Sequence, residues 1–165
     1  MKFETWPLDS RRKKNRTEKK REGLNWKIEA GLSILFLFWV AVAYSQSLLK
    51  IPVYIQSKEI RVEVVRTPEE ISRGLMGRKH LGKDEGMLFL FDAEDYHVFW
   101  MKNTLIPLSI AFIDKNKQII WVEEMEPLTL DSHVPPKPIL YALEMNKGWF
   151  SSHGIKKGDA IRFSK

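Results

Sequence analysis

The segment FWMKNTLIP (residues 99–107) brings an aromatic pair, a lysine, an amide and a hydroxyl group together in nine positions. Lys102 supplies a point charge, and Asn103 and Thr104 supply hydrogen-bond donors and acceptors. With Trp100 as an aromatic wall, they form a polar rim that suits an anionic or sugar-like ligand. The alternative is structural, because Asn and Thr in turns commonly bond nearby backbone groups. The pattern favours the turn.

Two charged residues elsewhere complete the candidate binding site. Arg73 ends a predicted short helix, and Glu144 ends an apolar strand, where an unpaired acid is expensive to bury. An ion pair of Glu144 with Arg73 or Lys102 is the preferred interpretation. The alternative is an envelope hydrolase or lyase that acts on carbohydrate or peptide through Glu144 and Lys102. That alternative requires Glu144 to lie in an open cleft without an arginine partner.

Metal binding and nucleophilic catalysis have weaker signals. His97 lies close in sequence to Trp100 and Met101, and Met76 or Met87 could join them. Thioether and imidazole ligands select Cu(I), so a periplasmic Cu(I) carrier is the third candidate function. Methionine on a strand more often fills a core, and we expect no cofactor. The sequence also lacks the HExxH spacing, the GxSxG elbow and any cysteine.

A β-rich module from residue 58 onward positions these side chains. Alternation and short apolar runs predict strands at the following places: from Glu59 to Val64, then 86–91, 97–101, 108–114, 118–125, 139–145 and a last strand near the C-terminus. Thr67 and Glu70 form a capping box that starts one short helix, and Gly154 closes a second. We expect the Pro-rich loop 126–138 to roof the site. The predicted fold class is mainly β (β-rich α+β), a barrel-like or sandwich domain with two short helices.

The first part of the chain has a different composition. Of the 27 Lys and Arg and the 21 Asp and Glu residues, 11 and 5 precede Lys58, and the remainder balances at 16 against 16. A basic run over 11–27 precedes an apolar run over 30–44 that continues weakly to Leu49. The positive-inside bias predicts a cytoplasmic N-terminus and an extracytoplasmic C-terminal module.

This pattern predicts four regions in the chain. They are a basic cytoplasmic tail (1–27), one transmembrane anchor or signal helix (28–49), a linker (50–57) and the β-rich domain (58–165). Cleavage of the apolar segment would leave a secreted or periplasmic module. The expected partners are the membrane, through the N-terminal segment, and an unknown small ligand or envelope protein. We expect no nucleic-acid partner, because the module has no net basic excess.

Three stretches of the module resemble a known family. They are EISRGLMGRKHLGKDEGMLFLF, FWMKNTLIPLSIAFID and YALEMNKGWFSSHGIKKGDAI, in this order and at these spacings. Together they resemble the domain of unknown function family 192 (DUF 192) over nearly the whole module. The resemblance implies a compact β-rich domain, often behind a signal or membrane segment, and it implies no established activity. The favoured function is therefore a non-enzymatic binding or accessory module of the cell envelope.

Overall fold

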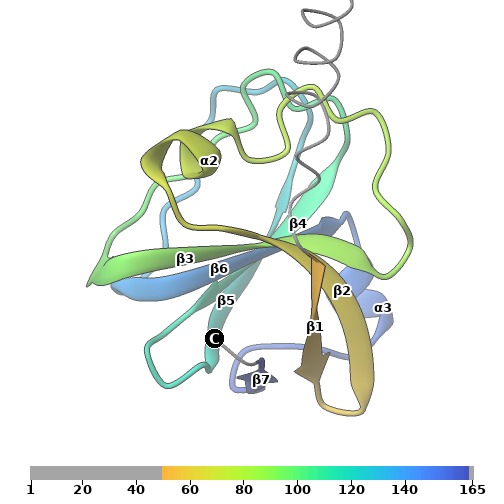
Figure 1. Cartoon of the computed structure of the whole chain (residues 1–165), viewed down its shortest axis with the longest axis vertical. Helices are drawn as coiled ribbons and strands as arrows, with labels where there is room; N and C mark the ends of the chain where they lie inside the picture. The colour runs from red at the N-terminus through yellow and green to blue at the C-terminus, as the bar shows by residue number, and fades with distance from the viewer. Residues whose placement is uncertain (1–49, 164–165) are drawn as a thin grey trace, which may run out of the picture. The chain divides into compact units, whose positions relative to one another are not determined.

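The computed structural model describes residues 50–163, which form one curled sheet and two short helices (Figure 1). The strands lie in the order β5-β4-β6-β3-β2-β1-β7. Their bounds are β1 Lys50–Ile55, β2 Lys58–Val65, β3 Glu85–Asp95, β4 Leu108–Ile113, β5 Ile119–Met125, β6 Ile139–Asn146 and β7 Ile161–Arg162. The helices are α2 Pro68–Arg73 and α3 Trp149–Ser152. Among these strands, β2 and β3 are the only parallel pair. After β2, helix α2 and the loop that follows return the chain to the end of the sheet at which β2 began, so β3 runs in the same direction as β2.

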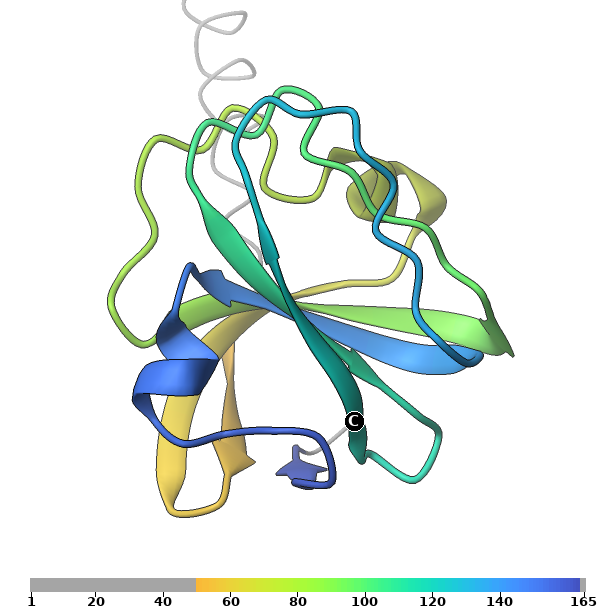
Figure 2. The same cartoon turned by 180° about the vertical axis from the view of Figure 1, so that it is seen from behind.

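The sheet curls into a half-barrel, and the short β7 lies near its open side (Figures 1 and 2). Gln118, just before β5, forms an isolated bridge with Ala160, just before β7. The Ile119 N–H donates to the Asp159 carbonyl at 2.8 Å. Strand β7 also pairs with β1. The bridge therefore joins β5 and β7, which are the two ends of the strand order.

Two hydrophobic clusters cover the two faces of the sheet. Ile119 on β5 and Ile161 on β7 share one cluster although they belong to opposite ends of the strand order, so this face is the concave one. Trp149 and Phe150 of α3 pack into it. The second cluster lies on the convex face, which α2 and the loops beside it cover (Figure 1). Every residue of β4 is buried because both of its faces are covered.

The predicted strand at 97–101 is wrong. In this segment only Phe99 pairs with another chain segment, through an isolated bridge to His133. The neighbouring segment, 126–138, has four prolines, which lack the N–H groups that a longer ladder needs. The predicted alternation does hold in the burial, since Phe99 and Met101 are buried and Trp100 is 52% exposed.

Two element boundaries also differ from the prediction. The range predicted as a linker, 50–57, contains strand β1, which pairs with β2 along its whole length. Strand β3 continues to Asp95 through residues predicted as a turn. The two short helices are confirmed, and so is the Thr67–Glu70 capping box.

Residues 50–163 contain no helix long and apolar enough to cross a membrane. The predicted tail (1–27) and anchor (28–49) lie outside the described residues.

Candidate functional site

A pocket of about 190 Å³ opens on the convex face beside α2, β3 and the segment 97–104. Its walls are mostly apolar and aromatic: Ile71, Leu75, Met76, Phe89, Phe91, Val98, Phe99 and Trp100. Its remaining lining comes from Ser72, Arg73, Gly74, His97, Thr104 and Glu144. We call it the Glu144 pocket, because Glu144 is its one carboxylic acid.

Glu144 is 5% exposed and lies on β6 between Met87 of β3 and Ile110 of β4. Both neighbours belong to the hydrophobic cluster of the convex face. Among the residues that the structure describes, no hydrogen bond or ion pair holds its carboxyl group, and burial raises its pKa from the ordinary 4.5 to about 8. The carboxyl group is therefore mostly protonated at neutral pH.

The backbone around Glu144 is closely packed against β3. A Cβ atom at Gly86 would lie 2.4 Å from the Glu144 carbonyl oxygen and 2.4 Å from the Met145 sulfur. Real Cβ atoms do not approach backbone this closely, so only glycine lets β3 approach β6 at this point. Gly86 thus helps to fix where the Glu144 side chain leaves the sheet.

Helix α2 places another part of the pocket wall. The Thr67 hydroxyl accepts from the Glu70 N–H at 3.3 Å, and the Glu70 carboxylate accepts from the N–H groups of Arg66 and Thr67 at 3.0 and 3.1 Å. These two backbone N–H groups also lower the pKa of Glu70. The capping box fixes the start of a six-residue helix that brings Ile71 and Arg73 to the pocket.

Glu144 is the middle member of a row of three glutamates across the convex face. In the register of the sheet, Glu63 of β2 lies opposite Met87. On the other side, Glu123 of β5 lies opposite Ile110. Residues directly opposite one another on neighbouring strands point to the same side of a sheet, so all three carboxyl side chains leave the sheet toward the same side.

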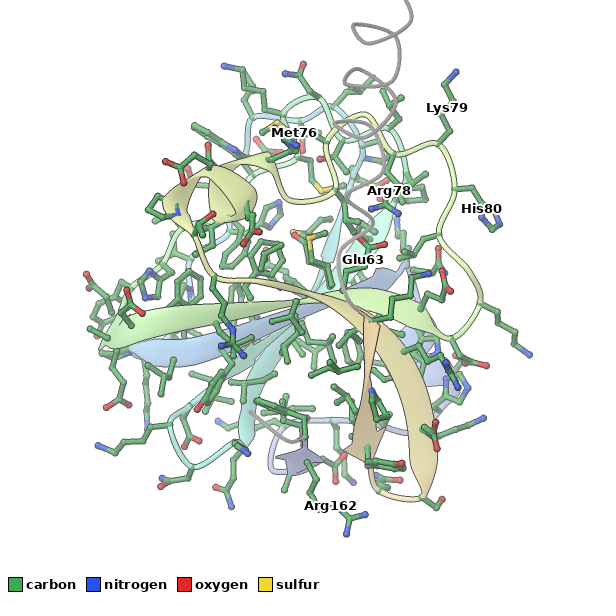
Figure 3. The ribbon with its side chains drawn as sticks, viewed as in Figure 1. Glu63, Met76, Arg78, Lys79, His80 and Arg162 are labelled. Carbon is green, nitrogen blue, oxygen red and sulfur yellow. The ribbon has the colours of Figure 1, made fainter. Side chains whose placement is uncertain are left out.

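Glu63 is held by Arg78 of the loop that follows α2. The guanidinium donates to both carboxylate oxygens, at 2.9 and 2.6 Å, and this pairing raises the Arg78 pKa. Figure 3 shows Arg78 pointing down to Glu63, whereas Lys79 and His80 point away from the sheet. The ion pair therefore fastens this loop over the convex face.

Glu123 is held by His133 of the Pro-rich loop. The His133 Nδ1 lies 2.6 Å from the Glu123 carboxylate, and the Nε2 is buried without a partner among residues 50–163. The His133 backbone also exchanges two hydrogen bonds with Phe99, at 2.9 and 3.0 Å. Both outer glutamates thus have a partner side chain, whereas residues 50–163 supply none for the middle one.

The structure brings four of the six predicted site residues together. The pocket is lined by Arg73, Trp100, Thr104 and Glu144. The predicted ion pair of Glu144 with Arg73 or Lys102 does not form. The predicted roof is also wrong, because no residue of the loop 126–138 lines the pocket.

The other two predicted residues, Lys102 and Asn103, lie outside the pocket lining. Lys102 Nζ lies 5.7 Å from the ring centroid of Trp100, on the exposed side of the segment. Asn103 has a left-handed φ of 59°, and its carbonyl accepts from the Gly77 N–H at 2.8 Å. Asn103 thus lies in a turn, as predicted, but residues 50–163 contain no hydrogen bond from the Asn103 or Thr104 side chain to nearby backbone.

The residues considered for Cu(I) do not all line the pocket. Met87 and Met101 are buried in the convex-face cluster and do not line the pocket. His97 and Met76 do line it, but the His97 ring stacks on Phe91 at 3.5 Å and its Nε2 lies 3.1 Å from the Ala93 carbonyl.

Sequence reasoning missed the partners of the outer glutamates and most of the aromatic wall. Alternation assigned Glu63 to a solvent face, but the loop after α2 covers that face. Val65, two residues on, was the available signal, because an apolar residue on the same face indicates burial on both sides.

The curled sheet and its two short helices define the class of the module, a small β-rich domain. The DUF192 family model, described as an uncharacterized ACR, matches residues 51–163. The chain belongs to the DUF192 family, and the resemblance in the sequence is confirmed.

Solved structures similar to this chain agree with that assignment. One is a putative transcription regulator from Sinorhizobium meliloti 1021, with a TM-score of 0.68 and 31% identity over 71% of this chain and 95% of the other. Another is a protein of unknown function from Novosphingobium aromaticivorans DSM 12444, with a TM-score of 0.68 and 34% identity over 72% and 88%. No functionally curated protein matches the chain.

Proposed function

We propose that this chain is a membrane-tethered, extracytoplasmic module that binds a small ligand in the Glu144 pocket and has no catalytic role. The observation that carries the proposal is a Glu144 carboxyl group that is almost wholly buried, finds no partner among residues 50–163 and lines a mostly apolar and aromatic pocket. A buried polar group that lacks a partner costs free energy, which a ligand with a matching group recovers. A concave, mostly apolar site with few polar groups is typical of small-molecule binding.

Binding is favoured over hydrolysis or lyase chemistry by the composition of the pocket. Both glycosidic and peptide hydrolysis need a second group beside the acid, such as a base or a nucleophile. The lining contains no second carboxyl group, and Lys102, the partner that the enzyme alternative requires, is not part of it. The lining does include His97, but its ring stacks on Phe91 and its Nε2 lies 3.1 Å from the Ala93 carbonyl. A single protonated Glu144 can hold a ligand without reacting with it.

Tethering is supported by the sequence. The excess of Lys and Arg before Lys58 and the apolar run that follows the basic residues favour one span with the module outside the cytoplasm. Carbonate extraction tests this: the full chain should stay in the membrane pellet, and external protease should cut the module in spheroplasts. Release by carbonate, or protection from protease, would contradict it.

A nucleic-acid partner is not favoured, although one similar structure is described as a putative transcription regulator. The module carries as many acidic as basic residues from Lys58 onward. Non-specific affinity for nucleic acid comes mainly from Lys and Arg contacts with phosphate, and this module has no excess of them.

A fragment screen tests the binding function directly. The full chain in lipid nanodiscs is screened by ligand-observed NMR against aromatic fragments with one polar group. We expect several fragments to bind the wild type and to lose at least about tenfold in affinity in Glu144→Gln. The exposed Glu59→Gln is the matched control and should bind as the wild type does. If no fragment binds, or if all bind both variants equally, the pocket is not a Glu144-dependent site.

A further inference from the structure

The Glu144 pocket contains a carboxyl group for which residues 50–163 provide no hydrogen-bond partner. No donor from the described residues reaches the carboxyl group, and its neighbours in the sheet, Met87 and Ile110, are apolar. The two other glutamates of the row each have a positively charged or protonatable partner, Arg78 or His133. The middle position of the row therefore has no such partner among residues 50–163.

The pocket walls suit a cation with an apolar body. Phe89, Phe91, Phe99 and Trp100 surround the space, and aromatic ring faces attract organic cations. Thr104, which is buried and lines the same pocket, supplies a hydroxyl oxygen that can accept from an ammonium group. A strongly hydrated inorganic cation needs more oxygen ligands than this pocket provides.

We infer that the ligand of the Glu144 pocket is a small organic ammonium ion, a primary amine with an apolar or aromatic body, whose nitrogen donates to the Glu144 carboxylate. This inference rests on the proposed binding function and names its ligand class. Binding moves one proton: the Glu144 carboxyl group releases it to solvent, and the amine binds in its protonated form.

The other ionisable groups around Glu144 are few. Met87 of β3 and Ile110 of β4 carry no charge, α2 contributes Arg73, and the segment 97–104 contributes His97. Arg73 is exposed and makes no ion pair with Glu144. Beyond the two apolar neighbours, the next carboxyl groups in the row are already paired.

The amine therefore competes with a proton for Glu144, and this sets the sign of the pH dependence. Because burial holds the pKa of Glu144 near 8, little carboxylate is present at pH 6. Amine affinity should rise roughly tenfold per pH unit from pH 6 to near 8, and then level off. A neutral ligand that accepts from the protonated carboxyl group would show the opposite trend and weaken above pH 8.

Three probes with the same ring separate the ligand classes: benzylamine, benzyl alcohol and benzoate. Affinities for the full chain in nanodiscs are measured by calorimetry between pH 6 and 9. We expect benzylamine to bind best at pH 8, with the rising pH profile. It should lose at least about tenfold in Glu144→Gln and keep its affinity in Glu59→Gln. His97→Gln should keep the rising profile, which assigns the proton to Glu144.

The two levels of the proposal fail in different ways. Preference for benzyl alcohol or benzoate, a falling pH profile, or unchanged benzylamine binding in Glu144→Gln would overturn the amine assignment and leave the binding function standing. Binding of none of the three probes would also overturn it. Only the fragment screen, by giving no Glu144-dependent binder of any class, would remove the binding function as well.

Discussion

The three glutamates on the convex face differ in the side chains that pair with their carboxyl groups, and Glu144 differs most from the other two. An acid in apolar surroundings normally gains a partner or is replaced, because burial of a carboxylate costs several kcal/mol. Glu123, which is half-buried, pairs with His133, and the buried Glu63 follows that rule through Arg78. Glu144 does not, and a group that lowers stability without a structural return is often there for function.

Glu144 should make the protein less stable as pH rises. Its pKa is about 8 in the folded state and about 4.5 when exposed, so the unfolded state ionises first and the folded state is penalised between these values. Urea unfolding from pH 5 to pH 8 should show a loss of about 4 kcal/mol in the wild type relative to Glu144→Gln. Parallel pH profiles for the two proteins would show that Glu144 is not a buried neutral acid.

Replacing one partner of the Glu63–Arg78 pair should lower the free energy of unfolding more than replacing both partners. Arg78→Met leaves a carboxylate with 7% side-chain exposure unpaired, and we expect it to lower the free energy of unfolding by about 1–3 kcal/mol. Glu63→Gln combined with Arg78→Met should recover most of that loss. Chemical denaturation of the wild type and these two variants measures the difference in the free energy of unfolding. Equal stability of the single and double variants would mean that the buried charge is not the cause.

Elements were predictable where a local pattern determined them. The Thr67–Glu70 capping box predicts α2, and the apolar run IAFI within 108–114 predicts β4, because each signal lies within one element. The segment 97–101 was wrongly predicted as a strand. Its alternation reflects the burial of Phe99 and Met101 and not pairing with a neighbouring strand. Pairing depends on residues distant in sequence, such as His133, which local periodicity does not report.

The candidate site was predictable only in part for the same reason. Glu144 and Arg73 were selected by residue type, and both line the pocket. Phe89 and Phe91 also line the pocket, but the sequence identifies them only as strand residues. Local sequence does not show which part of the sheet α2 leaves uncovered. The turn role of Asn103 follows from its φ of 59° and its bond with Gly77, which only the fold brings together.

The contact between β3 and β6 should tolerate no side chain at Gly86. We expect Gly86→Ala to destabilise the protein by about 1–3 kcal/mol, because a Cβ would meet backbone and a buried sulfur. Gly82→Ala is the matched control, since its Cβ would meet only the movable Glu85 side chain. Thermal unfolding of both variants measures the difference, and a loss of equal size in both would contradict the close approach.

The whole module depends on β1, which the sequence had placed in a linker. Val53 and Ile55 are fully buried, and β1 joins β2 to β7 in the strand order. A fragment that starts at Gln56 should therefore fail to fold, since the loss approaches the total stability of a small domain, about 5–15 kcal/mol. A fragment that starts at Lys50 should show native dispersion of its amide NMR signals. Equal dispersion in both fragments would make β1 dispensable.

According to the proposal, the Glu144 carboxyl group is protonated in the free protein and ionises when a cationic ligand binds. The most direct measurement is the carboxyl ¹³C NMR signal of Glu144 at pH 7, assigned by its absence in Glu144→Gln, with and without benzylamine. We expect the chemical shift of a protonated carboxyl group for the free protein and that of a carboxylate after benzylamine is added. A Glu144 that is already ionised in the free protein, with a signal that benzylamine does not move, would contradict it.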